Sequence, residues 1–218
     1  MPTSAPIVYV VDDDTSMARA LNRLLTAAGY VAQTFASATE FLAQHRPEQR
    51  GCVVADLRMP VMGGFELHAA LKRSGNPLPI VFLTGHGDIP TSVHAIKDGA
   101  EDFLTKPVAK DKLLAAVQRS LAADAAVSMQ LAKRSVLQRN YELLSPRERE
   151  VLAHITTGKL NKQIAAELGT TLRTIKAHRS SIIAKMQARS SAELGIMAVS
   201  VIPQKPLPAP GGNWSKVQ

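Results

Sequence analysis

The sequence predicts an α/β fold, a doubly wound parallel sheet, followed by a smaller all-α domain. Short apolar runs alternate with helical patterns through the first half of the 218 residues, whereas the second half shows helical patterns only. Such alternation is typical of a parallel sheet covered by helices. Charge divides the chain at the same place, because residues 1–122 carry 12 acidic and 12 basic side chains and residues 123–218 carry 6 and 14. A basic second half suggests a module that binds a polyanion.

Five apolar runs predict the strands. Each run is short, and continuous apolar character is typical of strands that are buried on both faces. We expect a parallel five-stranded sheet of order 2-1-3-4-5, with strands at Ile7–Val11, Tyr30–Phe35, Cys52–Leu57, Pro79–Thr84 and Asp102–Thr105.

Helical patterns separate these strands. The first helix carries apolar residues at helical spacing from Ala20 to Ala28, and Gly29 stands where a C-terminal cap is expected. The other helices of this half are predicted at Thr39–Gln44, Gly63–Ser74 and Thr91–Asp98, and from Lys110 onward.

The basic domain begins with a strong helix start. Ser145 and Glu148 fit a capping box, with Pro146 at the first helical position. Gly158 ends that helix, and three further helices are predicted at Asn161–Leu168, Arg173–Ala188 and Ser191–Ser200.

Between the two domains, residues 123–140 are rich in Ala and contain no Gly or Pro. They predict a helical linker that can continue the preceding helix. A solvated linker fits the weak heptad of Val127, Leu131 and Val136 better than a coiled coil between two copies. The expected domains are therefore 1–122, a linker at 123–140, a helical domain at 141–200 and a Pro/Gly-rich tail at 201–218.

Charged and hydroxyl side chains gather where the predicted strands end. Asp12 and Asp13 follow the first strand, Asp56 lies at the end of the third, Thr84 ends the fourth and Lys106 follows the fifth. Singly, each is an ordinary turn residue or solvated charge. In a doubly wound sheet these ends meet at one edge, where the carboxylates would repel one another unless a cation neutralises them. Mg²⁺ prefers oxygen ligands and leaves coordination positions open.

These side chains suit phosphoryl transfer. A carboxylate oxygen of Asp56 can attack phosphorus and form an acyl phosphate. Mg²⁺ would offset the charge on the phosphoryl oxygens, and the Lys106 ammonium and the Thr84 hydroxyl can each hold one of those oxygens.

The stretches VVDDD, DLRMPVMGG, FLTGHGD and DFLTKP resemble the motifs of response-regulator receiver domains. The resemblance covers the first half of the chain and implies a (βα)5 receiver fold with Asp56 as the phosphoacceptor. It also implies that Asp12, Asp13 and the backbone carbonyl of Arg58 complete the Mg²⁺ site.

The same resemblance identifies the paired switch residues as Thr84 and Phe103, and the phosphate-contacting lysine as Lys106. The Lys106–Pro107 bond is similar to a cis peptide of the family. The stretch GHGD resembles the FixJ-like subgroup. The switch aromatic is Phe here rather than Tyr.

The spacing of three small or apolar residues in the second half fits a helix-turn-helix. Counted from Asn161, Ala165 is fifth and permits close helix approach, Gly169 is ninth and allows the turn, and Ile175 is fifteenth and packs the second helix on the first. Residues 170–190 carry five basic side chains and no acidic one, which strengthens this interpretation.

A helical wheel gives this second helix an inward face with Ile175, Ile182 and Met186. His178 is expected to be a packed edge residue rather than a metal ligand, and Arg179 is expected to reach a phosphate from the core side. Lys176 can contact either a guanine edge or a phosphate. The candidate DNA contacts are Arg173, Thr174, Lys176, Ala177, Arg179 and Ser180.

The stretches LSPREREVL, GKLNKQIAAELG and TIKAHRSSIIAKM resemble the LuxR/NarL/FixJ DNA-binding domain. That resemblance implies a four-helix domain that binds double-stranded promoter DNA as a dimer. The leading hypothesis is a transcription regulator that is switched by a sensor histidine kinase, forms a homodimer on phosphorylation or on DNA, and has RNA polymerase as a further candidate partner.

Two other hypotheses stay open. An aspartyl-phosphate phosphohydrolase would have a second acid two residues after its catalytic Asp, where this chain has Arg58. A constitutive DNA-binding protein would use the first domain only to dimerise. We expect no enzyme beyond a receiver acting on its own phosphorylation and dephosphorylation. The single cysteine, Cys52, and the absence of a signal or membrane segment predict a cytoplasmic protein with no membrane partner.

Overall fold

The computed structural model describes residues 5–46, 49–74, 78–85 and 100–201. The chain divides into two compact units, residues 1–129 and residues 130–218. The predicted helix at Thr91–Asp98 and the tail residue Trp214 lie outside the described residues.

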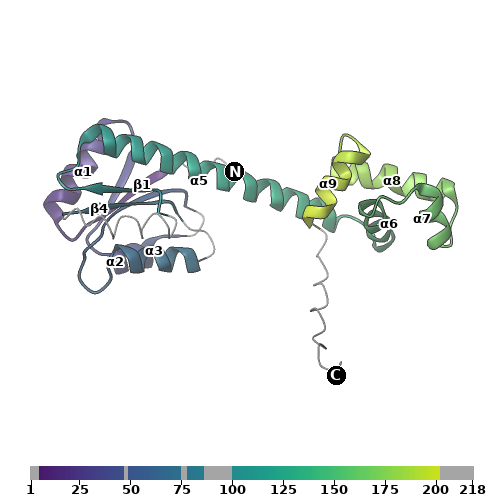
Figure 1. The fold of residues 1–218 in the computed structure, drawn as a ribbon, viewed down its shortest axis with the longest axis horizontal. Helices are drawn as coiled ribbons and strands as arrows, with labels where there is room; N and C mark the ends of the chain where they lie inside the picture. Colours follow the sequence, from purple (N-terminus) through teal and green to yellow (C-terminus); the bar gives the residue numbers. More distant parts are fainter. Residues whose placement is uncertain (1–4, 47–48, 75–77, 86–99, 202–218) are drawn as a thin grey trace, which may run out of the picture. The chain divides into compact units, whose positions relative to one another are not determined.

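The first unit is built on a parallel five-stranded sheet of order β2-β1-β3-β4-β5, as the sequence predicts (Figure 1). The register places Val10 of the first strand between Thr34 and Val54 of its two neighbours. The strands are β1 (Ile7–Val11), β2 (Val31–Phe35), β3 (Gly51–Asp56), β4 (Ile80–Thr84) and β5 (Asp102–Thr105).

Helices cover both faces of this sheet, with α1 and α5 on one face and α2 and α3 on the other (Figure 1). Asp14 accepts hydrogen bonds from the amides of Ser16 and Met17 and so caps α1, and Ser37 caps α2 in the same way. The helices are α1 (Thr15–Ala27), α2 (Ala38–Gln44), α3 (Gly64–Arg73) and α5 (Lys110–Glu142).

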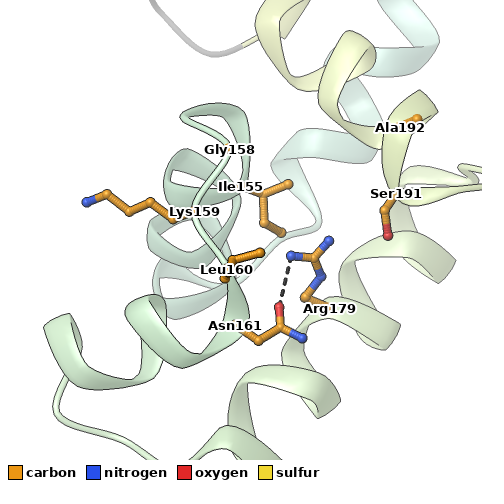
Figure 2. Close-up of a pocket in the computed structure, with 8 residues that line it drawn as sticks. All are labelled: Ile155, Gly158, Lys159, Leu160, Asn161, Arg179, Ser191 and Ala192. Atoms are coloured by element: carbon orange, nitrogen blue, oxygen red, sulfur yellow. Dashed lines mark hydrogen bonds between the residues drawn. The ribbon is translucent and has the colours of Figure 1, made fainter.

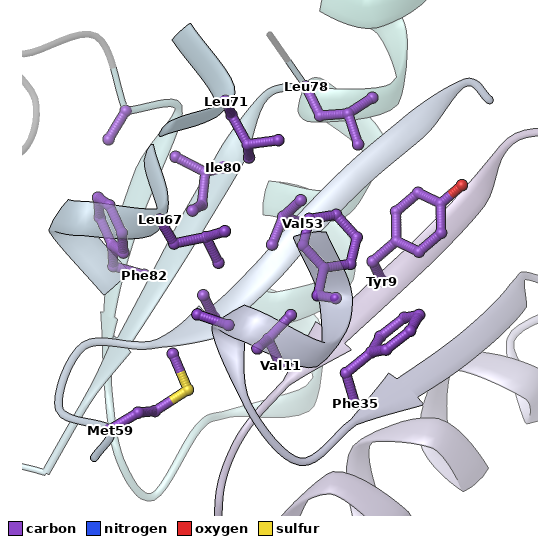
Figure 3. Close-up of a cluster of buried hydrophobic side chains, with 14 residues drawn as sticks. Tyr9, Val11, Phe35, Val53, Met59, Leu67, Leu71, Leu78, Ile80 and Phe82 are labelled. Carbon is purple, nitrogen blue, oxygen red and sulfur yellow. The ribbon is translucent and has the colours of Figure 1, made fainter. Parts of the chain in front are cut away.

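The two faces of the sheet each carry an apolar layer, which is why the central strands β1, β3 and β4 are nearly continuous apolar runs. Tyr9 and Val11 point into the layer beneath α2 and α3, together with Phe35 and Phe82 (Figure 3). The alternate residues Val8 and Val10 enter the opposite layer beneath α1 and α5.

Helix α5 contains 33 residues and runs without a break through the predicted linker. The boundary between the two units falls inside it, after Met129. The heptad residues Val127, Leu131 and Val136 are exposed in the single chain.

The second unit is a helical domain around one apolar core, to which Val151, Ile164, Ile175 and Leu194 each contribute from a different helix. The capping box of Ser145 and Glu148 is present, with Pro146 at the helix start. The helices are α6 (Pro146–Thr156), α7 (Asn161–Glu167), α8 (Leu172–Met186) and α9 (Ser191–Val201).

Glu148 joins α6 to α8 through a buried carboxylate. Besides the Ser145 amide, it accepts hydrogen bonds from Ser181 Oγ at 2.6 Å and Lys185 Nζ at 2.7 Å. Burial acts to raise the pKa of Glu148, but the hydrogen bonds from Lys185, Ser181 and the Ser145 amide outweigh it and lower that pKa to about 2. Glu148 therefore sets how α8 sits on the domain.

The substitution Glu148→Ala should lower the free energy of unfolding of the second unit by about 2–3 kcal/mol near neutral pH, because several charge-assisted hydrogen bonds are lost. Since the folded pKa lies below the ordinary value of 4.5, this stabilisation is present above about pH 4.5 and is lost as the pH falls toward 2. Urea unfolding followed by circular dichroism should show the difference from wild type shrinking in acid.

Glu150→Ala is the matched control, because Glu150 lies on the same helix but is exposed and forms a surface ion pair with Arg147. Its expected effect is within about 0.5 kcal/mol. Equal stability of the two variants at neutral pH would contradict the role given to Glu148.

Candidate functional site

The parallel sheet brings distant polar residues to one edge. Asp12 follows β1, Asp56 is the last residue of β3, Thr84 is the last residue of β4 and Lys106 follows β5. Because β1, β3, β4 and β5 are successive neighbours, these four positions lie side by side.

Lys106 contacts two carboxylates at this edge of the sheet. Its Nζ lies 2.8 Å from Asp12 Oδ2 and 3.1 Å from Asp56 Oδ2. The other oxygen of Asp12 accepts a hydrogen bond of 2.9 Å from the Asp14 amide. Burial acts to lower the pKa of Lys106, but its hydrogen bonds and charge interactions with Asp12 and Asp56 outweigh it and raise that pKa. The ammonium is therefore held in its charged form.

The three carboxylates form a compact cluster. Oxygens of Asp12, Asp13 and Asp56 lie within 4.8 Å of one another, with Asp12 buried, Asp56 half-buried and Asp13 exposed. Burial raises the pKa of Asp12 above its ordinary value, against the hydrogen bonds from Lys106 and the Asp14 amide. A hard divalent cation fits this donor set, because it would take oxygen ligands and relieve their repulsion.

The remaining residues predicted for this site lie on or beside the same strands. Thr84 is 3 % exposed, and its carbonyl oxygen accepts a hydrogen bond of 2.6 Å from the Lys106 amide. Phe103 is half-buried and pairs with Phe82 in the sheet register. The Lys106–Pro107 bond is cis, as the resemblance implies. Arg58 is exposed, and its amide lies 3.5 Å from Asp56 Oδ1.

One residue at this edge, Gly64, is not among those that the sequence predicts for the site. Gly64 begins α3, and a Cβ atom there would lie 2.9 Å from the carbonyl oxygen of Asp56 and 3.0 Å from the Phe82 ring. Glycine thus lets α3 start directly against the end of β3. The pair Gly63-Gly64 after the strand is the sequence signal that could have indicated this close approach.

Helix α8 buries the face that the sequence predicts to point inward. Ile175, Ile182 and Met186 are buried. Thr171 caps the helix by accepting a hydrogen bond from the Thr174 amide, and His178 is half-buried. Of the candidate DNA contacts, Thr174 and Arg179 are half-buried, and the exposed ones are Arg173, Lys176, Ala177 and Ser180.

Two of the cations of α8 are bound to partners within the second unit. Arg179 Nη1 donates to Asn161 Oδ1 at 2.9 Å in a pocket between the start of α7 and the start of α9 (Figure 2). Lys185 pairs with Glu148. Arg173, Lys176 and Arg189 form no ion pair within the described part of the chain. Fewer cations are therefore free to contact DNA than the five basic residues counted at positions 170–190.

Two known families match successive parts of the chain. Residues 8–118 match the response regulator receiver domain, and residues 142–198 match the luxR family of bacterial regulatory proteins. The chain therefore belongs to the response regulators, with a receiver followed by a LuxR-type DNA-binding domain. Within that class it is of the NarL/FixJ type, because FixJ proteins are among its close relatives.

The relatives share nearly the whole architecture. The response regulator TodT of Pseudomonas putida is 40% identical over 194 residues, which cover 89% of this chain and 86% of that protein. The transcriptional regulatory protein FixJ of Azorhizobium caulinodans is 41% identical over 199 residues, covering 91% and 94%. The solved structure of the response regulator StyR is 42% identical, with a TM-score of 0.81 and coverage of 90% and 99%.

Among the helices in the described ranges, none is both long enough and apolar enough to span a bilayer.

The substitution Gly64→Ala should destabilise the first unit by about 1–3 kcal/mol, because the new methyl group meets the Asp56 carbonyl and the Phe82 ring in a packed region. Thermal unfolding of the full chain measures this effect. Gly195→Ala is the control, since a Cβ atom at Gly195 in α9 meets nothing within 4 Å. That change should stabilise the protein by about 0.5–1 kcal/mol. Equal shifts in both variants would show that Gly64 is not constrained by its neighbours.

Proposed function

We propose that this chain is a transcriptional regulator whose DNA binding is switched by phosphorylation of Asp56. The observation that carries the proposal is the meeting of Asp12, Asp56 and Lys106 at one sheet edge in a chain that also holds a LuxR-type domain. The phosphoryl donor is a phosphohistidine of a sensor kinase, as the receiver domain suggests.

The chemistry follows from the positions of the side chains. A carboxylate oxygen of Asp56 attacks phosphorus, the P–N bond to the kinase histidine breaks, and an acyl phosphate forms on Asp56. Lys106, already 3.1 Å from Asp56, stays beside the new phosphoryl group and binds one of its oxygens. The hydroxyl of Thr84 binds another.

Mg²⁺ is the proposed cofactor of this step. Asp12, Asp13 and Asp56 would hold the ion, together with the backbone carbonyl of Arg58. When bound, it would offset negative charge on the transferring phosphoryl group. The surrounding residues position the phosphoryl oxygens and keep Asp56 in place.

The proposed switch acts through the partner residues Thr84 and Phe103. Drawing Thr84 toward the phosphoryl group leaves space for Phe103 to turn inward, and the surface near β5 rearranges. That change promotes dimerisation, releases the second unit, or does both. Coupling of this kind is typically worth about 1–3 kcal/mol, so the unphosphorylated protein keeps weak DNA affinity.

The proposed DNA interface is the exposed start of α8, which would enter the major groove. Lys176 has the position and the unpaired charge for a base or phosphate contact. Arg179, held by Asn161, is oriented for a phosphate at the edge of the helix. Arg173, Thr174, Ala177 and Ser180 complete the interface. A homodimer on repeated sites and contact with RNA polymerase in the cytoplasm belong to the same proposal.

An independent phosphohydrolase activity is the less favoured alternative. Its second catalytic acid is absent two residues after Asp56, where the exposed Arg58 lies. The proposed catalysis is therefore confined to phosphorylation and dephosphorylation of Asp56 itself.

The substitution Asp56→Asn should abolish the gain in DNA affinity that kinase and ATP give to the wild-type protein, because the amide cannot form the acyl phosphate. DNA affinity is measured by fluorescence anisotropy on a duplex obtained by in vitro selection. The wild-type gain should be about 5- to 150-fold.

Asp111→Asn is the control, since Asp111 is an exposed carboxylate in the first turn of α5 and is not one of the proposed site residues. It should respond like the wild type. A full response of Asp56→Asn would exclude Asp56 as the acceptor. A wild-type protein that responds to neither kinase nor the phosphoryl mimic beryllofluoride would favour the constitutive alternative.

The substitution Lys176→Ala should weaken DNA binding, because it removes an exposed cation from α8. A base contact predicts a loss of about 1–3 kcal/mol on the selected duplex and a smaller loss on random DNA. A phosphate contact predicts equal losses on both and a salt slope reduced by about 1. Lys110→Ala, at the start of α5, is the control cation, and an equal effect of both variants would place Lys176 outside the interface.

A further inference from the structure

A buried ion pair holds α5 against the first unit at Asp124. Arg50 Nη2 lies 2.6 Å from Asp124 Oδ1 and 2.7 Å from the Asp124 carbonyl oxygen, and Arg50 Nε lies 3.1 Å from Oδ2. The Gly51 amide donates to Oδ2 at 3.2 Å. The side chains of Asp124 and Arg50 are 4 % and 18 % exposed. Four hydrogen bonds therefore converge on one residue of the helix.

This pair lies where the sequence predicts a linker. Asp124 falls in the predicted linker 123–140 and beyond residue 118, where the match to the receiver family ends. From Ala125 to Val136, every residue except Ser128 is exposed. Asp124 is thus the last buried position before α5 becomes solvated, and the expectation of a solvated linker from residue 123 is wrong at this residue.

The other member of the pair, Arg50, lies next to the strand that carries the phosphoacceptor. Arg50 directly precedes β3, whose first residue is Gly51 and whose last is Asp56. The start of β3 is tightly fixed, because the Ile7 amide bonds the Arg50 carbonyl and a Cβ atom on Gly51 would lie 1.8 Å from the Ile7 carbonyl oxygen. β3 therefore joins the phosphorylation edge to the position where α5 is held.

Arg50 favours the charged form of this carboxylate and fixes its position. Burial raises the pKa of Asp124, while the charge of Arg50 and the hydrogen bonds from Gly51 and Arg50 oppose that rise. A buried carboxylate without a partner is strongly unfavourable. Loss of either side chain should therefore release the helix rather than leave it docked.

We propose that Arg50 and Asp124 form an anchor that fixes where α5 leaves the receiver domain, and that this anchor is required for the phosphorylation state of Asp56 to reach the DNA-binding domain. Both are positioning residues, since neither touches the phosphoryl group. The claim that the anchor couples Asp56 to the DNA-binding domain rests on the proposed function. The claim that the anchor fixes α5 does not.

The first test is hydrogen exchange on the full-length chain carrying Asp124→Ala. Amides of residues 120–129 should lose protection by at least about tenfold, because local opening no longer breaks the anchor. Amides of residues 111–118 in the same helix should be unchanged. Asp124→Asn, which keeps the shape and part of the hydrogen bonding, should give a smaller loss, and exposed Asp111→Ala should give none. Unchanged protection at 120–129 in Asp124→Ala would overturn the anchor.

The second test measures DNA affinity with and without beryllofluoride and Mg²⁺ on the selected duplex. Asp124→Ala and Arg50→Gln should keep the basal affinity within about twofold but lose most of the gain, which in the wild type is expected to be about 5- to 150-fold. A full gain in a variant whose residues 120–129 have opened would overturn the coupling role. A wild-type chain without any gain would overturn the proposed function and the coupling role with it, while hydrogen exchange would still decide the anchor.

Discussion

The receiver site depends on one ammonium group placed between carboxylates. Lys106 contacts both Asp12 and Asp56, and without it three carboxylates within 4.8 Å would repel one another. The contact is possible only if the strands ending at these residues are parallel and in register. In the proposed mechanism, the same charge that stabilises this edge of the sheet would bind an oxygen of the phosphoryl group.

The same arrangement of a buried carboxylate and a cation recurs at two other places. Arg50 holds Asp124 at the start of β3, and Lys185 holds Glu148 under α8. In each case the carboxylate joins two elements that are far apart in the sequence. Such pairs specify geometry more than they add stability, because burying the charges costs much of what their attraction returns. Of these cations only Lys185 lies on α8, where its pairing with Glu148 reduces the charge available to DNA.

Much of this protein follows from local sequence patterns. The apolar runs place all five strands to within one or two residues, and the capping box of Ser145 and Glu148 gives the start of α6. Periodicity also assigns Ile175, Ile182 and Met186 to the core. These features depend on burial periods and on helix-end chemistry, which neighbouring residues determine. Alternation of strands and helices indicates a doubly wound sheet, and the resemblance to receiver domains favours the order 2-1-3-4-5 over the other orders that such sheets adopt.

The sequence by itself determined which charged residues lie at the ends of the predicted strands. It could not distinguish a solvated cation from one held by a buried partner, because pairs such as Arg50–Asp124 and Arg179–Asn161 join residues that no local pattern connects. The tertiary structure decided those pairings and, with them, where α5 stops packing on the first unit. Burial is the physical reason, since only the folded chain removes a carboxylate from water and makes its partner necessary.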